Sequence, residues 1–198
     1  MIKAKEIIDY LRLFCEDEAR YFYQNPSSNY WHYGWVQRLE RIPAIAALAV
    51  RKFPGDIVEI GCASGLMTVK LAEIARRNNR QVIAIDPWQR DLKDGISPDF
   101  EGFLKRTEKY KGTIEVSHCE SQDETVIESL KKRTIAFALV DGKHTYEAAL
   151  SDIGAVYHAG VICTDECLWD WPMLRAVHEG AGQRQKIRHP FCKEGYVV

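Results

Sequence analysis

The stretch Asp56-Ile57-Val58-Glu59-Ile60-Gly61-Cys62-Ala63-Ser64-Gly65 decides the fold of this chain. Its first five residues form a short apolar strand. Small residues then let the backbone turn tightly before an amphipathic helix at residues 66–75. A second apolar strand, 81–85, ends at Asp86. A strand, a glycine-bearing turn, a helix and another strand together predict one crossover unit of a parallel sheet.

The same alternation continues along the chain. Further strands are expected at 113–116, 135–140 and 160–163, and further helices at 99–110, 124–132, 146–157 and 174–179. Two short strands at 184–188 and 195–198 are joined by a turn too short for a crossover helix, so they add an antiparallel strand. Continuously apolar strands indicate a sheet buried on both faces. We therefore predict an α/β, Rossmann-like, doubly wound sheet of about seven strands, mostly parallel with an antiparallel final strand and helices on both faces.

Length and composition narrow the class of protein. The 198 residues suffice for one core, which we assign to 51–198, with 1–50 as a helical, aromatic extension. A formal net charge of -1 argues against a nucleic-acid binder. No stretch has the roughly 20 apolar residues of a membrane span, and the N-terminus does not resemble a signal peptide. Six scattered cysteines without a CxxC pair indicate reduced thiols in a cytoplasmic protein and argue against zinc.

The turn after the first strand suits a nucleotide-containing cofactor. Dinucleotide binders need a small residue where this chain has the bulky Leu66. The other common pattern places an acid two residues before the first glycine and small residues at alternate positions, here Glu59, Gly61, Ala63 and Gly65. Asp86, at the end of the next strand, is placed to accept hydrogen bonds from the two hydroxyls of a ribose. The alternative is a turn without a ligand, with Asp86 capping a helix.

On these residues the chain resembles the class I S-adenosylmethionine-dependent methyltransferases over residues 54–198. The resemblance implies S-adenosyl-L-methionine as cofactor, with the methionine half near the turn and the ribose at Asp86. It also implies that Trp88 packs on the adenine and that residues after the third strand lie at the adenine edge. The expected cofactor-binding residues are Glu59, Gly61, Ala63, Ser64, Gly65, Asp86, Trp88, Ser121 and Gln122.

The fourth and fifth strands end in acidic residues. Asp141 follows one strand, and Asp165 and Glu166 follow the other, so three carboxylates converge at neighbouring strand ends. Without a cation they would repel one another, whereas Mg²⁺ prefers such oxygen ligands. These segments resemble the metal-dependent O-methyltransferases of macrolide sugars, of the macrocin O-methyltransferase kind, except that Glu166 stands where those have aspartate. The alternative for the acidic pair is helix capping.

A methyl transfer to oxygen also needs a base and an acceptor site. His144, three residues after Asp141, is the expected general base, with Asp141 as a metal ligand and secondary base. The alternative for His144 is a solvent-facing residue at a helix start. Aromatic residues are expected to form the acceptor site, or else a small packed core. These are Tyr30, Trp31, His32 and Tyr33 of the extension, with Trp169 beyond the fifth strand.

The sequence thus predicts an S-adenosylmethionine-dependent, Mg²⁺-assisted O-methyltransferase for a hydroxylated small molecule, a sugar or secondary metabolite. Nucleic acid and membranes are not expected as partners, and a homodimer is an open alternative to a monomer. Three other functions compete with this prediction. They are a catalytically silent methyltransferase-like domain that binds a nucleotide or partner, a nicotinamide-dependent oxidoreductase and a nucleic-acid methyltransferase.

Overall fold

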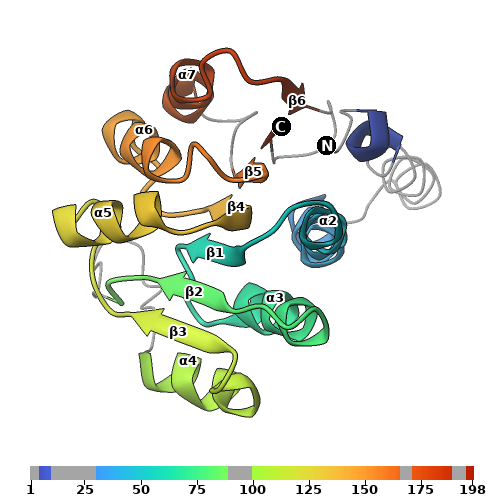
Figure 1. Ribbon diagram of the computed structural model, residues 1–198, viewed down its shortest axis with the longest axis vertical. Helices are drawn as coiled ribbons and strands as arrows, with labels where there is room; N and C mark the ends of the chain where they lie inside the picture. Colours follow the sequence, from blue (N-terminus) through green and yellow to red (C-terminus); the bar gives the residue numbers. More distant parts are fainter. Residues whose placement is uncertain (1–4, 10–29, 89–99, 166–170, 189–194) are drawn as a thin grey trace.

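The computed structural model describes residues 5–9, 30–88, 100–165, 171–188 and 195–198 (Figure 1). Its centre is a seven-stranded sheet in the order β3-β2-β1-β4-β5-β7-β6. The first five of these strands pair in parallel, and β7 pairs antiparallel with both β5 and β6. The strands are β1 Asp56–Ile60, β2 Val82–Ile85, β3 Ile114–Ser117, β4 Ile135–Val140, β5 Val161–Thr164, β6 Lys186–Arg188 and β7 Gly195–Val197. The predicted architecture is confirmed, including the antiparallel final strand.

Helices cover both faces of the sheet (Figure 1). One layer holds α2 and α3 and the other holds α5, α6 and α7, while α4 lies beside the edge strand β3. The helices are α2 Tyr30–Lys52, α3 Leu66–Arg77, α4 Phe100–Thr107, α5 Glu124–Lys132, α6 Tyr146–Ala155 and α7 Trp171–Gly180, with a 3₁₀ turn, η1, at Glu108–Tyr110. No described helix has the length and hydrophobicity needed to cross a bilayer.

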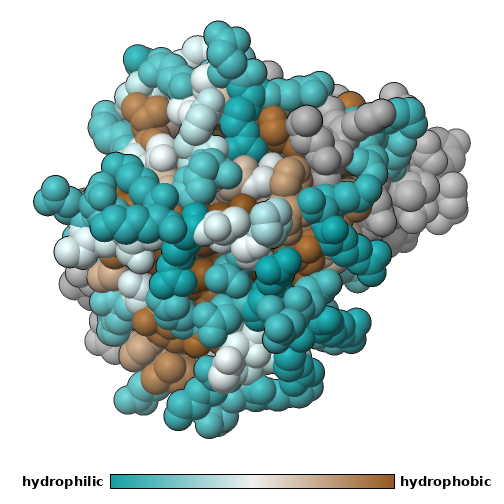
Figure 2. All heavy atoms as spheres, in the orientation of Figure 1, coloured by the Kyte–Doolittle hydropathy of each residue, from teal (hydrophilic) through white to brown (hydrophobic). Residues whose placement is uncertain are grey.

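The apolar strands explain why both faces are covered. Every residue of β2, β4 and β5 is buried, which matches their continuous hydrophobic sequences. The edge strand β3 differs, because two of its four residues are exposed. Figure 2 shows hydrophobic atoms at the end of this face where Figure 1 draws β3 and α4. Val116 of β3 and Leu104 of α4 are exposed hydrophobic residues. Elsewhere the margins of this face are mostly hydrophilic.

The helix before β1 is longer than the sequence indicates. The sequence favours a helix that follows the aromatic run 30–35 and continues through residues 44–50, whereas α2 is one helix from Tyr30 to Lys52 that includes this run and Pro43. A proline inside a helix costs about 3 kcal/mol. Ile42 and Ile45, on either side of Pro43, are fully buried in the core, and burying each contributes about 1.5–3 kcal/mol. Tertiary packing therefore offsets the local penalty, and the proposed boundary at residue 50 falls inside this core helix.

Candidate functional site

Four predicted site residues follow the carboxyl ends of four neighbouring strands. The backbone N–H of each continues the hydrogen-bond ladder one step beyond its strand. The bonds are Asp86 to Ser117 (3.2 Å), Gly61 to Ile85 (2.9 Å), Asp141 to Ile60 (2.8 Å) and Asp165 to Val140 (3.1 Å), each from N–H to carbonyl oxygen. Because this ladder runs across β2, β1, β4 and β5, it fixes the four residues side by side at one edge of the sheet.

The turn after β1 has backbone angles that favour glycine. Gly61 has φ +87° and Gly65 has φ +80°, both in the left-handed region. A Cβ atom on Gly61 would lie 1.9 Å from the carbonyl oxygen of Asp141, and one on Gly65 would lie 2.8 Å from the Phe103 ring. Ala63 also has a positive φ, +44°, but it is exposed. The glycines at 61 and 65 therefore allow the turn to pack closely against β4 and α4.

The carboxylate of Asp86 is directed into this turn. One oxygen accepts hydrogen bonds from the backbone N–H groups of Cys62 and Ala63, both at 2.9 Å, and the other accepts from the N–H of Trp88 at 2.7 Å. A carboxylate offers about four acceptor positions, so three are already used. Asp86 is thus a structural support of the turn with room for about one more donor. Its predicted contact with both ribose hydroxyls remains a prediction.

Trp88 supports the same turn from outside. Its indole Nε1 donates to the carbonyl oxygen of Ala63 at 2.8 Å, and its ring packs on Phe100 and Phe103 with centroid distances of 4.8 and 4.6 Å. His118, which was not predicted as a site residue, packs edge-on against the Trp88 ring with a centroid distance of 5.3 Å. Trp88 is therefore buried in an aromatic cluster, and its stacking on adenine remains a prediction.

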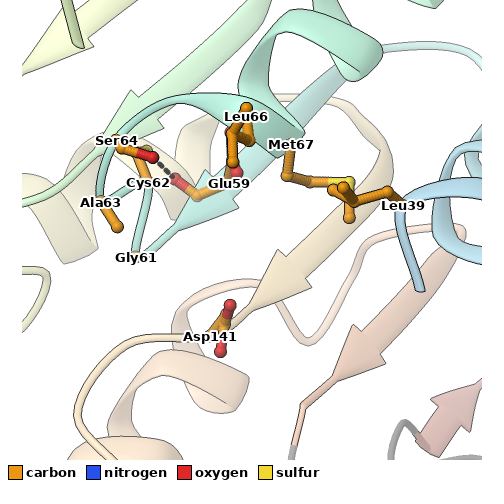
Figure 3. A pocket seen from close by; sticks show the side chains of 9 residues that line it. All are labelled: Leu39, Glu59, Gly61, Cys62, Ala63, Ser64, Leu66, Met67 and Asp141. Carbon is orange, nitrogen blue, oxygen red and sulfur yellow. Dashed lines mark hydrogen bonds between the residues drawn. The ribbon is translucent and has the colours of Figure 1, made fainter. Parts of the chain in front are cut away.

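A pocket opens between this turn and the end of β4 (Figure 3). Its cavity volume is about 120 Å³, below the roughly 300–1,000 Å³ typical of small-molecule sites, so it can enclose only part of such a ligand. The lining residues are Leu39, Glu59, Gly61, Cys62, Ala63, Ser64, Leu66, Met67 and Asp141. The start of α3 contributes free backbone N–H groups and a positive dipole end, whereas Glu59 and Asp141 contribute acidic groups. Such a pocket suits a ligand that carries both a carboxylate and a cationic group.

The thiol of Cys62 lines the pocket but is not suited to act as a nucleophile. Burial raises the pKa of Cys62 well above its usual value, and the negative charges of Glu59 and Asp86 raise it further. Its sulfur lies 3.5 Å from the carbonyl oxygen of Glu59 and 3.6 Å from that of Ile85. The protonated thiol therefore acts as a small buried group that donates weak hydrogen bonds.

Beside the pocket, Asp141, His144 and Asp165 form an acidic cluster. One ligand atom from each lies within 4.8 Å of the others, and His144 Nε2 lies 3.3 Å from Asp141 Oδ1. Asp165 is buried, and His144 is exposed. The N-cap of α6 is Thr145, which accepts a hydrogen bond from the N–H of Ala148. His144 is therefore not needed as the cap. The two carboxylates at this spacing fit a divalent cation that prefers oxygen ligands, with the imidazole beside it.

Comparison with known protein families decides the identity of the fold. Residues 58–160 match a family described as a methyltransferase domain, which is more than half of the 198 residues. The chain belongs to this methyltransferase family. It is accordingly an S-adenosylmethionine-dependent methyltransferase, and the resemblance seen in the sequence is confirmed.

Solved structures share the fold of this methyltransferase at low sequence identity. The O-methyltransferase NovP has a TM-score of 0.65 at 18% identity, covering 81% of this chain and 78% of its own. CalS11, a TDP-rhamnose 3'-O-methyltransferase of calicheamicin biosynthesis, has a TM-score of 0.59 at 15% identity, covering 100% of this chain and 95% of its own. PaMTH1 of Podospora anserina, solved with SAH bound, has a TM-score of 0.56 at 11% identity, covering 100% and 97%. No curated protein matches the methyltransferase by sequence.

Several predicted site residues lie away from the pocket or outside the described residues. Ser121 and Gln122 do not line the pocket, although a Cβ atom on Gly142, the residue after the pocket residue Asp141, would be 4.0 Å from Ser121 Oγ. Glu166 and Trp169 fall outside the described residues. Tyr30, Trp31, His32 and Tyr33 lie in α2, but their side chains are not described. The metal role of Glu166 and the acceptor roles of these aromatic residues therefore remain predictions.

One polar residue of this region was missed from the sequence. Asp152 of α6 is buried, with 1% of its surface exposed, and its Oδ1 accepts a hydrogen bond from Gln122 Nε2 at 2.8 Å. The available signal was helical periodicity, because Asp152 shares the buried face of α6 with Ala148, Ala149 and Ile153. A charged residue on the apolar face of a helix is uncommon and indicates a specific role.

Asp152 gives the methyltransferase a predictable pH dependence of stability. Burial raises the pKa of Asp152 above its unfolded value, and hydrogen bonds from Ser121 and Gln122 oppose that effect only in part. The stabilisation from its protonated form is thus fully present below about pH 4 and is lost as the pH rises through the folded-state pKa. Compared with wild type, Asp152→Asn should gain free energy of unfolding as the pH rises through that window. Urea unfolding at several pH values tests this. Asp123→Asn, at an exposed position, serves as the control, and parallel curves for wild type and Asp152→Asn would refute the prediction.

Proposed function

We propose that this methyltransferase transfers the methyl group of S-adenosylmethionine to a hydroxyl oxygen of a small molecule, with Mg²⁺ held by Asp141 and Asp165. The observation that carries the proposal is the position of Asp141. It lines the pocket beside the glycine turn and also belongs to the acidic cluster with His144 and Asp165. A methyl donor in the pocket and an acceptor at the cluster would therefore meet at one residue.

The residues that line the pocket would bind the methyl donor, S-adenosylmethionine. The carboxylate of the methionine part would lie at the start of α3, where backbone N–H groups lack helical partners. Its cationic groups would lie between Glu59 and Asp141, whose side chains approach the pocket from different strands (Figure 3). The turn itself is held from behind by Asp86 and Trp88. These contacts fix the donor before the acceptor arrives, which lowers the entropic part of the barrier.

The residues of the acidic cluster would activate the acceptor hydroxyl. A bound divalent cation would lower the pKa of the acceptor hydroxyl and fix the position of its oxygen. An ionised Asp141 only accepts hydrogen bonds, so His144 donates to it from Nε2 and keeps Nδ1 as its basic nitrogen. We propose that Nδ1 takes the hydroxyl proton while the oxygen attacks the methyl carbon. The carbon–sulfur bond breaks, its electron pair stays on sulfur, and the neutral thioether S-adenosylhomocysteine leaves.

Replacing His144 tests its role as base. In His144→Ala, kcat should fall about 100-fold, the lower end of the range for removal of a general base. The base works only when unprotonated, so the wild-type rate should rise with pH through the imidazole pKa and then level off. The variant should lack this inflection. His178→Ala, at an exposed position in α7, is the matched control and should behave as wild type. A wild-type pH profile in His144→Ala would exclude histidine as the base.

The proposed reaction is tested by incubating the protein with S-adenosylmethionine and a panel of hydroxylated sugars and phenols. Mass spectrometry should find one acceptor heavier by one methylene unit, together with S-adenosylhomocysteine. Turnover should stop in chelator and return with added Mg²⁺, while the affinity for S-adenosylhomocysteine changes little. Cofactor binding with no transfer to any acceptor, with or without Mg²⁺, would instead favour a catalytically silent binding domain. Small-molecule acceptors remain the proposed partners, and a homodimer remains a prediction.

A further inference from the structure

The side-chain N–H₂ group of Gln122 makes both of its hydrogen bonds inside the protein. Its Nε2 donates to Ser121 Oγ at 2.6 Å and to Asp152 Oδ1 at 2.8 Å, which uses both of its hydrogens. Among the described residues, none donates a hydrogen bond to its carbonyl oxygen Oε1. Gln122 is partly exposed, whereas Ser121 and Asp152 are buried. The polar atom that Gln122 presents to a ligand is therefore an acceptor.

Asp152 determines this orientation. A serine hydroxyl both donates and accepts, so Ser121 alone would tolerate either end of the amide. An ionised carboxylate only accepts, so it requires the N–H₂ end. The reversed amide would set two acceptor oxygens against each other at a buried position, where unmade hydrogen bonds are most costly. Asp152 thus fixes which end of Gln122 faces outward.

Burial of Asp152 is unfavourable for the protein, which indicates a role other than stability. Burial raises the pKa of Asp152, and the neighbouring charge of Glu120 raises it further. The nearby Lys143 forms its ion pair with Glu120, at 2.9 Å. No described lysine or arginine forms an ion pair with Asp152. A neutral side chain would be easier to bury in this helix face.

The network lies next to the pocket. Asp152 Oδ2 and Ser121 Oγ would lie 3.2 and 4.0 Å from a Cβ atom on Gly142, and Gly142 directly follows the pocket residue Asp141. A Cβ atom at residue 142 would crowd this carboxylate, and glycine leaves room for it. The carboxylate thus lies against Gly142, and the amide is joined to the carboxylate by its hydrogen bond.

We propose that Asp152 is a positioning residue for recognition of the purine, because it holds the Gln122 carbonyl oxygen outward to accept a hydrogen bond from the 6-amino group of adenine. The inference rests on the proposed cofactor site and on the expectation, implied by the family resemblance, that Ser121 and Gln122 lie at the adenine edge. A 6-oxopurine presents an acceptor at the same place, so two acceptors would face each other. The site should therefore select the amino form of the cofactor.

Calorimetry with two ligands tests the proposal. S-adenosylhomocysteine carries the 6-amino group, and S-inosylhomocysteine carries a 6-oxo group. Wild type should bind the first at least about tenfold more tightly, as expected when a polar contact is replaced by a mismatch. In Asp152→Leu and in Gln122→Leu this preference should fall to within about threefold. In the double variant the affinity for S-adenosylhomocysteine should be no lower than in Gln122→Leu, because Asp152 acts through Gln122.

Controls separate positioning from a purely structural role. Asp123→Asn, beside Gln122 but exposed, should keep the wild-type preference. If Asp152→Leu does not fold, Asp152→Asn replaces it. Asparagine both donates and accepts at nearly the same volume, so the preference should drop at least twofold. Equal weakening of both ligands, or losses that multiply in the double variant, would overturn the inference. Wild type that binds S-adenosylhomocysteine without preference would also overturn it, whereas wild type that binds neither ligand would refute the proposed cofactor site itself.

Discussion

Asp165→Ala is expected to lower kcat about 100-fold or more while the affinity for S-adenosylhomocysteine stays within a few-fold of wild type. Asp165 follows β5 and lies in the cluster with Asp141 and His144, but it does not line the pocket beside the glycine turn. Its loss removes a buried carboxylate that would hold the cation and leaves the cofactor contacts intact. A 100-fold loss corresponds to about 2.7 kcal/mol of transition-state stabilisation, a reasonable share for a metal ligand. Steady-state kinetics and calorimetry with the cofactor product measure the two effects separately.

Asp165→Asn provides the control for packing. Asp165 is buried, so alanine leaves a small cavity, whereas asparagine keeps the volume and removes the charge. Both variants should lose activity, and Asp165→Asn should retain more of the wild-type melting temperature. If either folded variant turned over at the wild-type rate, Asp165 would not be a metal ligand.

Gly61→Ala is expected to abolish measurable cofactor binding, a loss of about 100-fold or more in affinity. The added Cβ would lie 1.9 Å from the carbonyl oxygen of Asp141, and alanine disfavours a φ of +87°. The turn must therefore move away from β4, and such strained backbone positions cost about 1–3 kcal/mol. Moving the turn displaces the pocket wall formed by residues 61–64. Calorimetry with S-adenosylhomocysteine and thermal unfolding together test this prediction.

Two other glycines serve as matched controls. Gly112→Ala adds a Cβ with no atom within 4 Å, so its binding and stability should equal those of wild type. Gly55→Ala has a similar clash, 2.2 Å from the Thr134 carbonyl oxygen, at a φ of +104°. Gly55 lies before β1, at the opposite end of the strand from the pocket. The Gly55→Ala variant should therefore lose stability, while its folded fraction still binds the cofactor. Equal binding by Gly61→Ala and Gly112→Ala would show that the turn does not form the cofactor site.

The fold could be predicted largely from the sequence because its strands are short, apolar and followed by strong turn signals. Every predicted strand appears within two residues of its expected bounds. The N-terminal extent of α2 could not be predicted by local rules. Pro43 reads as a helix boundary by local rules, but Ile42 and Ile45 are fully buried on the core side of the helix, and that packing is not visible to a local pattern.

The site could be predicted less completely. The strand ends predicted that Asp86, Asp141 and Asp165 lie at one edge of the sheet, because parallel strands have their carboxyl ends at the same edge, while the roles of these residues remain predictions. Side-chain direction does not follow from that rule. The sequence did not reveal that Asp86 would bind the backbone of the turn, nor that Trp88 would be buried against Phe103. Both depend on contacts between residues far apart in the chain.

The central claim is that one crevice holds the cofactor and a divalent cation side by side. Proton relaxation of S-adenosylhomocysteine bound to the protein, with Mn²⁺ as a paramagnetic substitute for Mg²⁺, tests this claim most directly. We expect Mn²⁺ to relax the homocysteine methylene protons more strongly than the adenine protons, and we expect Asp165→Asn to remove the effect. No enhancement in wild type, or an enhancement that persists unchanged in Asp165→Asn, would contradict the account.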